Sequence, residues 1–150
     1  MSLEEPTILL VEDNPNDVFL IKRAIRKSNL ANPVQVTSNG DEAVAYLAGQ
    51  SPYTDRERYP LPTLILLDLK MPRKSGLEVL EWLRSQPELR RIGVVILTSS
   101  RESVDVNRAY DLGVNSYLVK PVARDALLEM MKSIGFYWLI LNENPDVSSV

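Results

Sequence analysis

The sequence contains neither cysteine nor histidine. Without cysteine the chain cannot form disulfides or thiolate zinc sites, and without histidine it has no imidazole to act as a metal ligand or general base. Any chemistry that the chain performs must therefore use carboxylates, hydroxyl groups and lysine.

Long apolar runs and an excess of basic residues are also missing. No stretch of about 18 apolar residues could span a bilayer, and the amino terminus lacks the features of a signal peptide. We therefore expect a cytoplasmic protein without a membrane partner. The net charge of −3 argues against nucleic acid as a partner, because such binding depends on a basic patch.

The chain is long enough for one well-packed domain, since 45% of its 150 residues are hydrophobic. We expect a single domain over residues 1–141. Within it, residues 135–141 extend the last helix and carry aromatic side chains. Residues 142–150 form a polar tail.

Five short apolar runs alternate with amphipathic segments, a pattern typical of strands that alternate with helices. The predicted strands are Thr7–Val11, Val34–Thr37, Thr63–Leu67, Gly93–Thr98 and Ser116–Val119. The first, third and fourth contain continuous apolar stretches, as strands covered by helices on both faces do. We therefore expect these three at the centre of a parallel sheet.

Capping residues support helices between these strands. Asn14 is a suitable N-cap before a proline, Ser75 and Glu78 have capping-box spacing, and Gly113 is typical of a helix end. The predicted helices cover residues 15–28, 40–48, 76–86, 102–112 and 123–141. The order of elements predicts an α/β fold with a doubly wound, five-stranded parallel sheet.

Polar residues follow or end four of the predicted strands. Glu12 and Asp13 follow the first, Asp68 the third and Lys120 the fifth, while Thr98 ends the fourth. In an open parallel sheet, sites form at the carboxyl ends of the strands. Clustered carboxylates repel one another unless a cation intervenes, and Mg²⁺ prefers oxygen ligands. We predict a Mg²⁺ site at Asp13 and Asp68, with Glu12 nearby directly or through water.

The same edge could form an aspartyl phosphate. A carboxylate can attack phosphorus while an ammonium and a hydroxyl group hold the other oxygens. Asp68, Lys120 and Thr98 supply these three groups. Each residue alone is more often structural, but their occurrence at successive strand ends favours a site.

The segments around these residues closely resemble the receiver domain of two-component response regulators. The resemblance rests on Leu9–Asp13, Leu66–Pro72, Ile96–Thr98 and Tyr117–Pro121. It implies a flavodoxin-like fold with strand order 2-1-3-4-5, which the hydrophobic periodicity alone does not give.

The resemblance also implies roles for individual residues. Asp68 would accept a phosphoryl group from a histidine kinase. Glu12 and Asp13 would form the acidic metal pocket, and the main-chain carbonyl of Lys70 would complete it. Lys120 would contact the phosphoryl group.

A switch is the second implication of the resemblance. The Thr98 hydroxyl would move toward the phosphoryl group and the Tyr117 ring would turn inward, shifting the face formed by the fourth helix, fifth strand and fifth helix. Lys70 and Ser100 would lie beside the path of the water that removes the phosphoryl group. The peptide between Lys120 and Pro121 would be cis.

Two features refine the family assignment. The loop Gly49–Pro62 is either a solvated insertion or a partner contact. The last predicted helix carries more apolar surface than one buried stripe requires, so it either forms a homodimer face or folds back on the core. The residues assigned to the dimer interface are Leu127, Met131, Phe136 and Trp138. These features resemble the stand-alone regulators of cyanobacterial phytochrome histidine kinases, and no motif for binding a chromophore is visible.

Two other functions use similar residues. A Mg²⁺-dependent phosphohydrolase acting through an aspartyl phosphate typically needs a carboxylate two residues after the nucleophile, and here that residue is Lys70. A constitutive scaffold with a vestigial site does not require the complete set of acidic, hydroxyl and lysine residues. Loss of phosphorylation in vitro would favour the scaffold.

Overall fold

The computed structural model describes residues 6–27 and 32–120. Several sequence-based predictions lie outside these residues. They are the helix at 123–141, the polar tail, the cis peptide at Pro121, and the interface residues Leu127, Met131, Phe136 and Trp138. No helix in residues 6–27 and 32–120 is long and apolar enough to cross a membrane.

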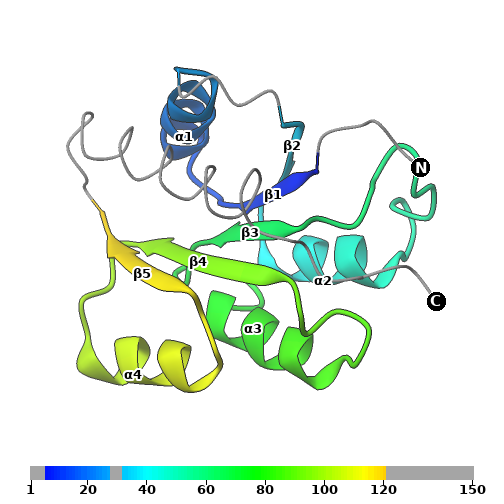
Figure 1. Cartoon of the computed structure of the whole chain (residues 1–150). Helices are drawn as coiled ribbons and strands as arrows, with labels where there is room; N and C mark the ends of the chain where they lie inside the picture. The colour runs from blue at the N-terminus through cyan, green and yellow to red at the C-terminus, as the bar shows by residue number, and fades with distance from the viewer. Residues whose placement is uncertain (1–5, 28–31, 121–150) are drawn as a thin grey trace.

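Strands and helices alternate along the described chain (Figure 1). The strands are β1 (Ile8–Val11), β2 (Val34–Thr37), β3 (Leu64–Leu67), β4 (Gly93–Thr98) and β5 (Ser116–Val119). The helices are α1 (Pro15–Lys27), α2 (Gly40–Ala48), α3 (Gly76–Ser85) and α4 (Ser103–Asp111). Over the described residues, the predicted bounds differ from these by at most one residue at either end.

The strands form one parallel sheet in the order β2-β1-β3-β4-β5. This confirms the predicted fold class and strand order. All residues of β1, β3 and β4 are buried, whereas the edge strands β2 and β5 are largely half-buried. The three strands that the sequence placed at the centre therefore lie there.

Helices pack on both faces of the sheet, with α1 on one side and α2, α3 and α4 on the other (Figure 1). Side chains alternate between the two faces along each central strand. In β1, Leu9 and Val11 pack with Tyr46 of α2 and Leu80 of α3. Ile8 and Leu10 pack with residues of α1 on the other face. Burial on both faces explains why the central strands are continuously apolar.

The predicted caps are present. The Asn14 side chain accepts hydrogen bonds from the main-chain N–H groups of Asn16 at 2.9 Å and Asp17 at 3.2 Å. Ser75 and Glu78 form the reciprocal capping box of α3. Gly113, just after α4, has a φ of 78°, the left-handed conformation that glycine adopts readily.

The 49–62 loop is only partly solvated. The guanidinium of Arg56 donates to the carbonyls of Tyr46 and Leu47 at the end of α2, at 2.8 Å and 2.9 Å. The Tyr59 ring packs edge-on against Tyr46 and Tyr53, and the Tyr53 ring is tilted against Tyr46, with ring centroids 5.0–5.9 Å apart. Many residues of the loop are exposed, as expected of a solvated insertion, but Tyr53, Arg56 and Tyr59 are half-buried and hold the loop against α2.

Candidate functional site

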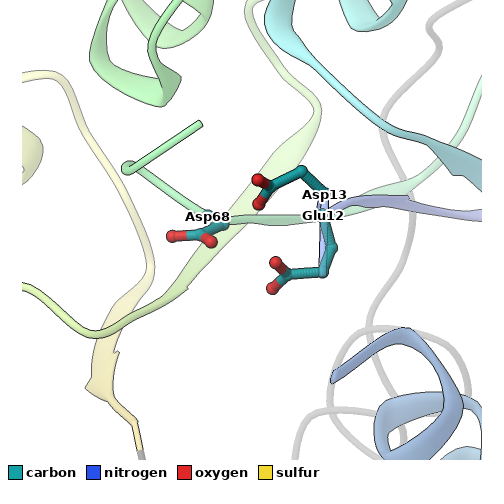
Figure 2. A group of neighbouring side chains, drawn as sticks. All are labelled: Glu12, Asp13 and Asp68. Carbon is teal, nitrogen blue, oxygen red and sulfur yellow. The ribbon is translucent and has the colours of Figure 1, made fainter. Parts of the chain in front are cut away.

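Three carboxylates converge at the carboxyl edge of the sheet (Figure 2). Glu12 and Asp13 follow β1 and Asp68 follows β3, and the ends of these strands are directly paired at Val11 and Leu67. One carboxylate oxygen from each residue lies within 4.8 Å of the others. Glu12 and Asp68 are only 2% and 6% exposed, while Asp13 is open to solvent.

Lys120, immediately after β5, supplies positive charge to this cluster. Its ammonium forms ion pairs with Glu12, with Asp17 at 2.9 Å and with Asp68 at 3.4 Å. Burial alone would lower the pKa of Lys120, but hydrogen bonds to Asp17 and Glu12 and the charge of Asp68 raise it above its usual value. Lys120 is therefore a fixed cation beside Asp68.

The single positive charge of Lys120 does not neutralise the three carboxylates with which it forms ion pairs. Burial, with a smaller contribution from the charge of Asp68, raises the pKa of Glu12 to about 7 despite its hydrogen bond from Lys120. The cluster offers only oxygen donors, which suit a hard divalent cation such as Mg²⁺ or Mn²⁺. The residues present thus fit the predicted metal.

The backbone after β3 holds Asp68 in place. Its main-chain N–H donates to the Val11 carbonyl at 3.0 Å, and its Oδ1 accepts from the Lys70 main-chain N–H at 3.1 Å. At the start of α3, Gly76 lies directly against this turn, and a Cβ there would come within 2.3 Å of the Asp68 carbonyl oxygen. The turn that presents Asp68 therefore requires glycine at position 76.

The two predicted switch residues lie next to Ser100. Thr98 is fully buried at the end of β4, and its hydroxyl oxygen accepts a long hydrogen bond, 3.5 Å, from the Ser100 main-chain N–H. The Tyr117 ring packs against the core, and its hydroxyl donates to the Ser100 carbonyl at 3.0 Å. The hydrogen bond of Thr98 is thus with Ser100 and not with Asp68.

A cavity of about 450 Å³ opens over the acidic cluster. Asp13, Asp68, Lys70 and Lys120 supply polar groups to its wall, and Leu20 of α1 supplies an apolar one. Its volume is within the range of small-ligand sites. The arrangement can accommodate an anionic group between the ammonium of Lys120 and a metal.

Two acidic residues near the site did not stand out in the sequence. Asp17 pairs with Lys120, and Asp105 pairs with Lys70. Both lie in the first turn of a helix, where acidic residues ordinarily stabilise the helix dipole. For Asp17 the signal in the sequence is its place in the first turn of the helix that directly follows the end of β1. No comparable signal in the sequence points to Asp105.

Comparison with known proteins identifies a family. The sequence model of the response regulator receiver domain matches residues 8–132. The response regulator Rcp1 of Synechocystis sp. is 40% identical over 132 residues, which cover 88% of each chain. The structure is similar to the phosphorylated cyanobacterial phytochrome response regulator RcpA, with a TM-score of 0.85 and 39% identity. The match covers 94% of this chain and 99% of RcpA. It is also similar to Mn²⁺-bound Rcp1, with a TM-score of 0.82 and 39% identity. The match covers 93% of this chain and 99% of Rcp1.

Proposed function

The chain belongs to the response regulator receiver domain family, and from that membership we propose that Asp68 accepts a phosphoryl group from a histidine kinase. The observation that carries this proposal is the contact between the Lys120 ammonium and Asp68, at 3.4 Å, beside two further carboxylates. It is the arrangement expected for a carboxylate that receives an anionic group. The family resemblance predicted from the sequence motifs is confirmed.

Transfer would proceed by in-line displacement at phosphorus. A carboxylate oxygen of Asp68 forms the new P–O bond as the P–N bond to the donor histidine breaks, and the electron pair of that bond returns to the imidazole nitrogen. The Lys120 ammonium, already within reach of Asp68, neutralises charge on the phosphoryl oxygens. The hydroxyl of Thr98, at the end of β4, would donate a hydrogen bond to another phosphoryl oxygen.

Mg²⁺ is the metal that we propose for this site. Glu12, Asp13 and Asp68 would hold it together with the main-chain carbonyl of Lys70, and the acidic cluster supports this assignment. A divalent cation there would neutralise the carboxylates and the incoming phosphoryl charge. The similarity to Rcp1 in its Mn²⁺-bound form also favours a divalent cation.

The signal would pass through Thr98 and Tyr117. When the Thr98 hydroxyl turns to the phosphoryl group, it leaves the Ser100 N–H, to which it is only weakly bonded. The Tyr117 ring, packed inward and bonded to the Ser100 carbonyl, would then be held in that position. The surface carrying α4 and β5 would change as a result.

The donor that we propose is a histidine kinase of the phytochrome type. Similarity to Rcp1 and to the phytochrome response regulator RcpA supports this choice. We further propose that the protein acts as a homodimer through the apolar residues that follow β5, and that its output is a protein contact.

The test is phosphorylation by acetyl phosphate with Mg²⁺, followed by intact-mass analysis. We expect wild type to gain the mass of one phosphoryl group, and Asp68→Asn or removal of Mg²⁺ to abolish the gain. Asp111→Asn, an exposed carboxylate change at the end of α4, is the matched control and should behave as wild type. An equal gain in Asp68→Asn, or no gain in wild type with either acetyl phosphate or a kinase donor, would contradict the proposal.

A further inference from the structure

A single carboxylate of α4 binds two side chains at the mouth of the site. Asp105 Oδ2 lies 3.3 Å from the Lys70 ammonium and accepts a hydrogen bond from the Ser100 hydroxyl. Lys70 is the second residue after Asp68, and Ser100 the second after Thr98. Asp105 therefore joins the loop that follows the acceptor to the loop that follows β4.

Asp105 is well placed to hold Lys70. Its side chain is only 12% exposed, whereas that of Lys70 is 54% exposed and retains freedom to move. Hydrogen bonding from Ser100 and pairing with Lys70 lower the pKa of Asp105 despite partial burial. The carboxylate is thus a fixed anion, and the lysine is its movable partner.

Lys70 also contributes to the wall of the cavity over Asp68. A phosphoryl group on Asp68 would place new negative charge in that cavity, two residues from Lys70. An ammonium on a flexible stem is attracted to such a charge. The phosphoryl group and Asp105 would therefore compete for one cation.

From this geometry we propose that Asp105 is a positioning residue that holds Lys70 away from the phosphoryl group and so opposes the phosphorylated state. The inference rests on the proposed function of Asp68. Departure of Lys70 would leave Asp105 with Ser100, whose carbonyl carries the Tyr117 hydrogen bond. The same movement would thus reach the switch residue Tyr117 through Asp105 and Ser100.

Binding linkage gives the direction of the effect. If phosphorylation draws Lys70 from Asp105, removing the charge of Asp105 must favour the phosphorylated form by the same free energy. Asp105→Asn retains an oxygen that can accept from Ser100 but no longer pairs ionically with Lys70. For a partly exposed ion pair the expected change in affinity is about two- to fivefold.

The experiment measures the dissociation constant of beryllofluoride, a phosphoryl mimic that binds aspartate, in the presence of Mg²⁺. We expect Asp105→Asn to bind it about two- to fivefold more tightly than wild type. In a Lys70→Ala background the same substitution should not change the dissociation constant, because the ammonium for which Asp105 and the phosphoryl group compete is absent. Asp111→Asn makes the same charge change on the same helix and should bind as wild type does.

The outcomes separate this inference from the proposed function. Wild-type affinity in Asp105→Asn, or an equal gain in the Lys70→Ala background, would overturn the role of Asp105 alone. Beryllofluoride binding that is absent in wild type or unchanged in Asp68→Asn would instead overturn the proposed function. If Asp105→Asn does not fold, Asp105→Ala offers the same test, because it also removes the carboxylate that pairs with Lys70 and should also tighten binding.

Discussion

The ammonium of Lys120 is shared among carboxylates, and it lies closer to Asp17 than to Asp68, the proposed phosphoryl acceptor. The ammonium lies 2.9 Å from Asp17 and 3.4 Å from Asp68. Because Lys120 occupies the space beside the metal ligands, its attraction to Asp17 reduces its competition with a bound cation. Asp17 also adds negative charge near the metal pocket. Both effects favour metal binding.

We therefore expect Asp17→Asn to weaken Mg²⁺ binding. Loss of one charge, screened by solvent at this partly exposed position, corresponds to ~1 kcal/mol, or about a fivefold rise in the dissociation constant. Isothermal titration calorimetry with MgCl₂ measures it, with Asp111→Asn as the control. Unchanged or tighter binding in Asp17→Asn would show that Asp17 plays no part in the metal site.

The residues of the site were predictable to different degrees. Glu12, Asp13, Asp68 and Lys120 follow apolar strands, and the parallel sheet brings such positions to one edge, so the sequence alone grouped them. Asp105 depends on where α4 sits relative to the loop after β3. That relation is set by tertiary packing and leaves no pattern in the sequence.

The start of α3 and the turn after β3 form one packed unit. The Gly76 N–H donates to the Leu69 carbonyl at 3.1 Å, and a Cβ at this position would come within 2.3 Å of the Asp68 carbonyl oxygen and 2.7 Å of the Leu69 Cα. Both contacts are with backbone, which cannot move aside as a flexible side chain can. A larger residue must therefore displace the helix or the acceptor.

Gly76→Ala should accordingly lower the free energy of unfolding by about 1–3 kcal/mol, a typical cost of overpacking, and slow phosphorylation by acetyl phosphate. Urea denaturation and the rate of mass gain measure the two effects. Gly113→Ala is the matched control, because its nearest neighbour is 3.6 Å away and only its φ of +78° is unfavourable. It should lose about 1 kcal/mol and phosphorylate normally. A normal phosphorylation rate in Gly76→Ala would contradict the link to Asp68.

The helices and strands were predicted well, but the packing of part of the 49–62 loop on α2 was not. Capping residues and apolar periodicity are local signals, so they fix the ends of elements within a residue. The packing of Tyr53, Arg56 and Tyr59 on α2 arises from contacts between segments. Prolines and charges give the loop the composition of a solvated segment, and this composition does not indicate that Tyr53, Arg56 and Tyr59 are half-buried.

At the level of the whole molecule, periodicity predicted an α/β sheet but not its strand order. Many doubly wound orders alternate strands and helices in the same way. The continuous apolar runs in the sequence did distinguish the central strands from the edge strands, because β1, β3 and β4 are covered on both faces. The order β2-β1-β3-β4-β5 was available beforehand only through resemblance to a family.

The apolar residues that follow β5 in the sequence bear on how the chain assembles. The sequence after β5 contains Leu127, Met131, Phe136 and Trp138, more apolar surface than one core-facing stripe needs. A helix with more apolar residues than its own core can cover commonly contributes to an interface between proteins. From the sequence we infer that these residues join two copies of the chain.

Replacing Phe136 and Trp138 with glutamate should therefore convert a dimer to a monomer, because charges at the centre of an apolar interface cannot be desolvated without cost. Sedimentation velocity over a range of concentrations measures the change. Tyr110→Glu is the matched control, an aromatic residue of α4 that is 52% exposed, and should leave the assembly as in wild type. If the double variant remains dimeric, this interface is wrong; if it unfolds, these side chains belong to the core of their own chain. A folded monomer that still accepts a phosphoryl group on Asp68 would show that dimerisation serves output and not phosphorylation itself.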